Sequence, residues 1–229
     1  MNDQSALASR LGVTFRDPNL LQQALVHRSY LNENRNFSLG NNERLEFLGD
    51  AVLELVVTEF LYLNYPNPEG ELTNWRAALV NAKMLSDIAE TFSIYEHLYL
   101  SRGEAKDSNG KARGYILANA FEAIIGAIYL DQGWDAAKKF ITDHVLSRLT
   151  AILDNKLHID PKSRFQEVSQ ERLGVTPSYR VIEESGPDHA KKFIVGVYTG
   201  TELVAQGEGT SKQEAQVAAA EKALQAKGW

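Results

Sequence analysis

The chain has 229 residues, which is enough for one large or two small domains with cores of their own. It has no cysteine, which excludes disulfide bonds and thiolate zinc sites and fits a reducing cytoplasm. Its net charge of −6, taken alone, argues against a nucleic-acid-binding protein. Two exceptions remain: a short basic strip can bind phosphates, and a cluster of acids can hold metal ions that bind them.

Apolar residues recur with a helical period through the first two thirds of the chain. Breaks rich in Gly, Pro, Asn or Ser separate these segments, as at residues 32–41 and 101–114. The sequence therefore predicts an all-helical domain over residues 1–152, with about six to eight helices. The polar N-terminal residues lack the apolar stretch of a signal peptide, so we expect none.

An acidic stripe lies on the segment Asn42–Leu53 and just beyond it. At about 100° per residue, four acids share one narrow face of a helix: Glu43, Glu46, Asp50 and Glu54. The other side carries apolar residues: Leu45, Phe47, Leu48, Val52 and Leu55. Taken alone, the stripe is explained equally well as a solvated helix face. Gly49 inside the pattern costs ~1 kcal/mol against alanine and suggests that another helix approaches closely.

A single carboxylate, Glu122, stands in the apolar run Tyr115–Leu130, which is too short and interrupted to span a bilayer. A buried carboxylate costs several kcal/mol unless it has a partner, a shifted pKa or a metal ion. Asn119 lies three residues earlier and so shares its helix face. Two helices that turn acids inward predict a divalent-metal site, for which a phosphodiester is a natural substrate.

The pattern changes after residue 152. The composition of residues 153–160 indicates a linker. The pattern of residues 161–229 predicts a small α+β domain with the order αβββα. The expected elements are helix 162–173, strands 179–184, 192–198 and 202–208, and a last helix ending at residue 227. A Ser-x-x-Glu capping box, Ser211 to Glu214, opens the last helix.

Asn42–Leu53 (NERLEFLGDAVL) resembles the signature of bacterial ribonuclease III almost residue for residue. The similarity extends, in the expected order, through Ala24–Asn32, Glu69–Val80 and Ile116–Asp131. The segment after the linker is similar to a double-stranded RNA-binding domain. The resemblance implies an all-α endonuclease domain followed by that αβββα domain.

The resemblance also implies site residues. Asp50, Glu122 and Glu43 match catalytic acids of the family. Glu46, Asn119, Glu122 and Asp50 match its metal positions. Asn119 departs from the family, which often has Asp there. A carboxamide oxygen can still ligate Mg²⁺, but one negative charge is lost, so we expect weaker metal binding.

Three further residues follow from the resemblance. Glu69 matches another acid that faces the cleft, with Glu71 as a rival. Phe47 matches an apolar side chain that enters the partner subunit, so a homodimer is implied. The implied activity is Mg²⁺-dependent cleavage of double-stranded RNA, with Mn²⁺ able to substitute, to products with 5′-phosphate and 3′-hydroxyl ends. No membrane and no small-molecule cofactor are implied.

By the same resemblance, the second domain reads the shape of duplex RNA across its minor grooves. The residues implied in RNA binding are Gln166, Glu167, His189 and Lys212. Gln213 and Gln216 stand where the family more often has at least one lysine. The alternative function is a double-stranded RNA-binding protein with weakened catalysis on a nuclease scaffold, which a cleavage assay with and without Mg²⁺ would discriminate.

Overall fold

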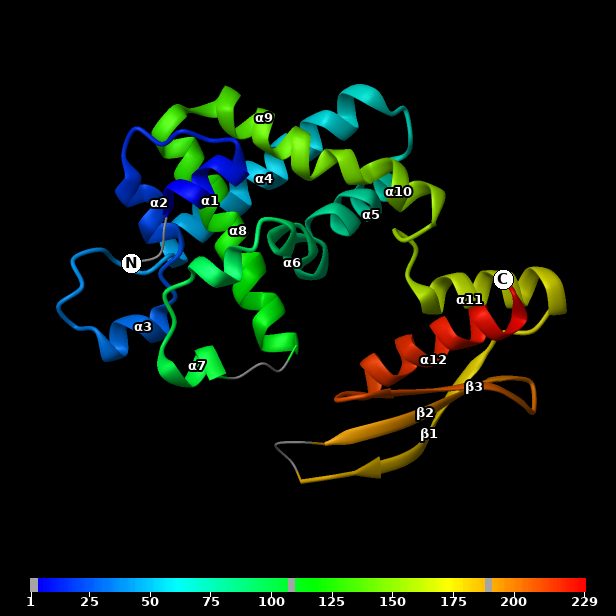
Figure 1. Ribbon diagram of the computed structural model, residues 1–229. Helices are drawn as coiled ribbons and strands as arrows, with labels where there is room; N and C mark the ends of the chain where they lie inside the picture. The colour runs from blue at the N-terminus through cyan, green and yellow to red at the C-terminus, as the bar shows by residue number, and fades with distance from the viewer. Residues whose placement is uncertain (1–3, 107–109, 188–190) are drawn as a thin grey trace. The chain divides into compact units, whose positions relative to one another are not determined.

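The computed structural model describes residues 4–106, 110–187 and 191–229. The chain divides into two compact units, Met1–His158 and Ile159–Trp229 (Figure 1). The first unit is helical, and the second combines three strands with two helices. Both fold classes expected from the sequence are confirmed.

The first unit contains ten α-helices and two 3₁₀-helices within the described residues. The α-helices are α1 (Gln4–Leu11), α2 (Pro18–Ala24), α3 (Arg28–Glu33), α4 (Glu43–Asn64), α5 (Glu69–Val80), α6 (Ala82–Thr91), α7 (Arg102–Lys106), α8 (Gly110–Gln132), α9 (Trp134–His144) and α10 (Leu149–Asp154). The 3₁₀-helices are η1 (Ile94–His97) and η2 (Leu146–Arg148). The predicted number of six to eight was too low. Elements of three to six residues complete less than two turns, so they leave no periodic signal in the sequence.

Helix α8 is the centre of this unit and packs against α2, α4, α6 and α9 (Figure 1). Many of its apolar side chains are fully buried, including Leu117, Phe121 and Ile125. Contrary to the sequence-based expectation, its segment Ala112–Gln132 is long and apolar enough to cross a membrane by length and composition. A core helix passes the same test, and the packing of α8 on four neighbouring helices is that of a core helix.

The second unit has the predicted order, with helices α11 and α12 on one face of a three-stranded sheet (Figure 1). Its elements are α11 (Pro161–Leu173), β1 (Ser178–Ser185), β2 (Lys192–Thr199), β3 (Glu202–Gly209) and α12 (Lys212–Lys227). The sheet is antiparallel in the order β1-β2-β3. Gly174, expected to stop the first helix, caps it in the left-handed conformation with φ +67°.

Two local details of this unit differ from the sequence-based expectation. Val181, an apolar residue of the expected strand 179–184, is not buried: it is 43% exposed and lies beside a register shift in β1. Ser211 caps α12 by accepting from the Glu214 amide, as predicted. The Glu214 carboxylate, however, accepts from the backbone amide and the hydroxyl of Thr210, the residue before Ser211.

Candidate functional site

Helices α4 and α8 cross with their backbones in contact, and two glycines allow this. A Cβ added to Gly49 would lie 1.8 Å from the carbonyl oxygen of Glu122. A Cβ added to Gly126 would lie 2.2 Å from the carbonyl oxygen of Leu45. The close approach that Gly49 predicted is therefore confirmed, and its counterpart is Gly126.

The crossing brings the acids of α4 beside Glu122. Burial, followed by the charges of Asp50, Glu46 and Glu54, raises the pKa of Glu122 to about 8. Burial, Glu43 and Asp50 also raise the pKa of Glu46 above its ordinary value. Like charges that share a partly desolvated site disfavour ionisation of one another. The local field is therefore strongly negative, and a cation would relieve it.

Glu54, the fourth acid of the stripe, is already engaged. The guanidinium of Arg76 on α5 lies 2.9 Å from its carboxylate and also donates to the Thr58 hydroxyl at 2.9 Å. Arg76 thus pairs one end of the stripe, whereas no ion pair of Glu46, Asp50 or Glu122 occurs among the described residues. Nothing in the sequence spacing pointed to this pair, because Glu54 and Arg76 lie on separate helices and meet only when α4 and α5 pack together.

Glu43 lies at the exposed start of the stripe. Its carboxylate accepts from the Asn41 side chain at 2.9 Å and lies 3.7 Å from the Arg28 guanidinium. Asp50 is also exposed, whereas Glu46, Asn119 and Glu122 are half-buried. The stripe therefore runs from solvent into the crossing of the two helices, so that a large substrate can reach it.

Glu69 and Glu71 both lie in the exposed first turn of α5. Glu69 accepts from the Thr73 hydroxyl at 2.9 Å and lines a pocket of about 430 Å³ beside Tyr62. Glu71 accepts from the Asn67 side chain at 2.8 Å. Neither acid is among the groups that raise the pKa of Glu122, so the placement of Glu69 in the cleft stays a prediction.

Within the described part of the chain, no three His, Asp or Glu side chains converge closely enough to form a metal cage. The donor set nevertheless suits a hard divalent cation, because Mg²⁺ prefers carboxylate and carbonyl oxygens and keeps several waters. Burial and then the neighbouring acids raise the pKa of Glu122 to about 8, and this gathering of acids beside a partly buried carboxyl is the observation in favour of a cation there.

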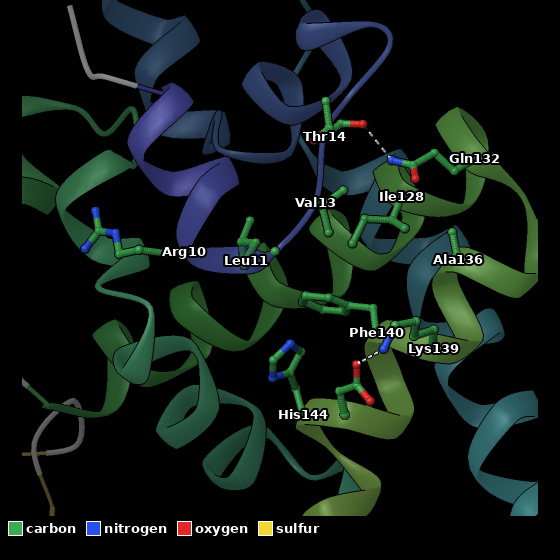
Figure 2. Close-up of a pocket in the computed structure, with 12 residues that line it drawn as sticks. Arg10, Leu11, Val13, Thr14, Ile128, Gln132, Ala136, Lys139, Phe140 and His144 are labelled. Carbon is green, nitrogen blue, oxygen red and sulfur yellow. Dashed lines mark hydrogen bonds and ion pairs between the residues drawn. The ribbon is translucent and has the colours of Figure 1, made fainter.

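A second concavity, shown in Figure 2, lies between the N-terminal segment, α8 and α9. It has a volume of about 500 Å³. Lys139 on its wall pairs with Asp143 at 2.6 Å, and the His144 ring packs edge-on against Phe140. Burial lowers the pKa of His144, so its imidazole is neutral at pH 7. This pocket holds packed or paired side chains and lacks the acid cluster of the α4–α8 crossing.

In the second unit, Gln166 and Glu167 are exposed on α11, and Lys212 is exposed in the first turn of α12. The Lys212 ammonium lies 3.7 Å from Glu184 at the end of β1 and 5.6 Å from the centre of the Phe193 ring. A helix N-terminus with an exposed lysine favours an anion. His189, the fourth residue implied in RNA binding, lies outside the described residues.

Comparison with known proteins decides the family. Residues 17–149 match the family described as "Ribonuclease-III-like", and residues 161–227 match the "Double-stranded RNA binding motif". The chain belongs to the ribonuclease III family.

Two curated relatives are similar along almost the whole chain. Ribonuclease 3 of Enterococcus faecalis is 46% identical over 219 residues, covering 95% of this chain and 94% of the relative. Ribonuclease 3 of Dehalococcoides mccartyi is 44% identical over 226 residues, covering 98% and 95%. A solved nuclease domain of ribonuclease III from Campylobacter jejuni covers 63% of this chain and 97% of that domain, with 40% identity and a TM-score of 0.57. Its description names a region involved in dimer formation.

Ribonuclease III proteins depend on divalent cations, which agrees with the chemistry of the acids at the α4–α8 crossing.

In this ribonuclease III chain, α4 also carries an exposed apolar strip. Phe47 is 80% exposed, Leu55 57% and Tyr62 77%, and all three fall within about 80° of arc on the helix. The apolar side of α4 is therefore divided, with Leu45 and Val52 buried and Phe47 and Leu55 exposed, and the exposure of Phe47 fits the expectation that it lies outside the monomer core.

Proposed function

We propose that this protein is an endoribonuclease that hydrolyses double-stranded RNA to products with 5′-phosphate and 3′-hydroxyl ends, in the processing of rRNA and mRNA precursors. One observation carries the proposal: two glycines let α4 and α8 touch, so that Glu46 and Asp50 lie beside Glu122 in one negative field. The match of the second unit to a double-stranded RNA binding motif supports the substrate. With no cysteine to oxidise, the chain suits the cytoplasm.

The test is cleavage of a long RNA duplex with and without Mg²⁺, followed by analysis of the product ends. We expect cuts in both strands only when the cation is present. Binding of the duplex without cleavage in Mg²⁺ would favour the alternative of an RNA-binding protein with a weakened catalytic site.

The residues that would hold the cation are Glu46, Asp50, Asn119 and Glu122, with Mg²⁺ as the cation and Mn²⁺ able to substitute. A bound divalent cation would offset charge on the phosphate oxygens and lower the pKa of a bound water. Glu122 holds a proton near pH 7 in the absence of a cation, so it would release that proton on becoming a ligand. Glu43 is exposed and accepts from Asn41, and it would meet the RNA at the edge of the site.

Asn119 gives the first prediction. We expect Asn119→Asp to lower the Mg²⁺ concentration for half-maximal cleavage by about fivefold, because a nearby charge contributes on the order of 1 kcal/mol even when solvent screens it. The measurement is the cleavage rate over a Mg²⁺ titration. Asn155→Asp is the matched control, since it adds the same charge at the exposed end of α10. An unchanged or raised requirement in Asn119→Asp would show that residue 119 is not a ligand.

We also propose that the protein is a homodimer in which Phe47 enters its partner. An interface with two-fold symmetry pairs the same patch of both subunits, so a protruding side chain needs a hollow on the same face. Phe47 stands beside a pocket of about 630 Å³ whose apolar lining includes Leu20, Leu48 and the exposed Leu130. This pocket is the proposed receiver of the partner's aromatic ring.

The dimer gives the second prediction. We expect Phe47→Ala to shift the protein toward monomer in sedimentation velocity while its helical content stays, because an 80% exposed side chain contributes little to the monomer core. Truncation of a central aromatic anchor in an interface often costs about 2 kcal/mol or more. Leu157→Ala, at a residue that is 63% exposed, is the control and should remain dimeric. A folded and fully dimeric Phe47→Ala protein would refute the placement.

A further inference from the structure

The start of α12 is poor in cations for a surface that grips phosphates. Its first turns carry Lys212, whereas Gln213 and Gln216 are neutral. The positive charge of Lys212 is also partly offset, because the Glu184 carboxylate lies 3.7 Å from its ammonium. Glu184 also pairs with Lys191 at 3.0 Å, so one carboxylate offsets part of the positive charge at this end of the unit.

A lysine from another helix, Lys162 on α11, places its ammonium next to the Gln216 side chain. Lys162, in the first turn of α11, donates from its ammonium to the Gln216 side-chain oxygen at 2.7 Å. The same ammonium lies 5.3 Å from the centre of the Tyr179 ring. Both partners are neutral, and both orient the ammonium without cancelling its charge. Gln216 is neutral, but its side-chain oxygen holds the Lys162 ammonium in place.

The positive charge of Lys162 is offset less by neighbouring carboxylates than the charges of Lys191 and Lys212 are. Across the described residues, no carboxylate lies within ion-pair distance of its ammonium, in contrast to Lys191 and Lys212. The nearest acid along the chain, Asp160, accepts from the amide and hydroxyl of Ser163 as the cap of α11. An ammonium has three donors, and the bond to Gln216 uses one of them, so two remain for an anion.

We propose that Lys162 binds a phosphate of the RNA duplex, so that α11 supplies the cationic contact that the neutral Gln216 leaves open on α12. This proposal rests on the proposed function, since it takes duplex RNA as the ligand of the second unit. Gln216 is then a positioning residue, which holds the ammonium of Lys162 beside the first turns of α12.

The test is the salt dependence of duplex binding by the full chain in EDTA, where cleavage is suspended. Each phosphate contact adds about −0.7 to −0.9 to the slope of log affinity against log salt. We expect Lys162→Gln to flatten the slope by about that amount and to weaken binding about five- to eightfold near 0.1 M salt. Lys212→Ala should flatten the slope similarly.

Lys227→Gln is the matched control, because it removes the same charge from the last turn of α12, where Lys227 pairs with Glu202. Its slope should equal that of the unmodified chain. A second arm moves the charge instead of removing it. The double variant Lys162→Gln with Gln216→Lys returns a cation to the same place from the other helix, so it should regain the original slope.

The outcomes separate the two proposals. No binding of duplex RNA by the unmodified chain, or no effect of Lys212→Ala, would contradict the RNA-binding role of the second unit itself. Normal binding with an unchanged slope in Lys162→Gln would overturn only the role of Lys162. A flattened slope that the double variant fails to restore would show that Lys162 acts by supporting the fold, and it would equally overturn the proposal.

Discussion

We expect Glu122→Gln to abolish cleavage of duplex RNA, by about 10³-fold or more, while binding of the duplex stays intact. A loss of that size corresponds to about 4 kcal/mol of transition-state stabilisation. Glutamine keeps the size of the side chain and its place at the α4–α8 crossing, but it cannot supply the negative charge that a divalent cation needs. The measurements are single-turnover cleavage in Mg²⁺ and duplex binding in EDTA.

Glu90→Gln, at an exposed acid of α6, is the matched control and should cleave normally. Equal loss of cleavage and of binding in Glu122→Gln would mean that Glu122 supports the structure and that the site lies elsewhere. Full activity in Glu122→Gln would contradict the proposed site altogether.

The same variant predicts a change in the pH dependence of stability. Without a cation, burial and the neighbouring acids raise the pKa of Glu122 from 4.5 to about 8. Between these two values the folded protein keeps a proton that the unfolded chain has released. The free energy of unfolding therefore falls as pH rises through this window and levels off above about pH 8. In EDTA, Glu122→Gln should show a shallower fall in melting temperature from pH 5 to pH 8 than the unmodified chain.

Gly126→Ala is the second variant with a large expected effect. Its Cβ would lie 2.2 Å from the carbonyl oxygen of Leu45 and 3.1 Å from the amide nitrogen of Gly49. Both are backbone atoms, so the clash cannot be relieved by a rotamer change, and the helices must move apart. Overpacking of this kind typically costs about 1–3 kcal/mol. We expect a lower melting temperature together with a loss of cleavage of tenfold or more, on the order of 1.4 kcal/mol or more in the barrier.

The control lies on the same helix. Gly114→Ala would place its Cβ at an ordinary 3.7 Å from the Ser86 hydroxyl, and alanine is favoured over glycine in a helix by about 1 kcal/mol. That variant should be as stable as the unmodified chain or more so, and fully active. A Gly126→Ala protein with unchanged stability and cleavage would show that the close crossing does not position the acids. Gly49→Ala, with a Cβ 1.8 Å from the Glu122 oxygen, tests the same crossing from α4.

Local patterns in the sequence were enough to predict the fold class and most elements. The acidic stripe of α4, the lone carboxylate in the apolar α8 and the mixed segment after the linker each depend on residues that are close in sequence. Helix caps such as Ser211 and Gly174 were predicted for the same reason, because a cap acts on the next turn of its own helix. Gly49 was predicted to mark a close helix approach because glycine is costly in a helix without such a reason.

Only the tertiary structure decided what those elements meet. It made Gly126 the partner of Gly49, paired Glu54 with Arg76 and left Phe47 exposed beside an apolar pocket. It also placed the Lys162 ammonium on Gln216, 54 positions later in the chain. Periodicity specifies which face of a helix a side chain occupies, but not which distant segment packs there. The raised pKa of Glu122 has the same origin, because burial and the charges of another helix exist only after α4 and α8 have come together.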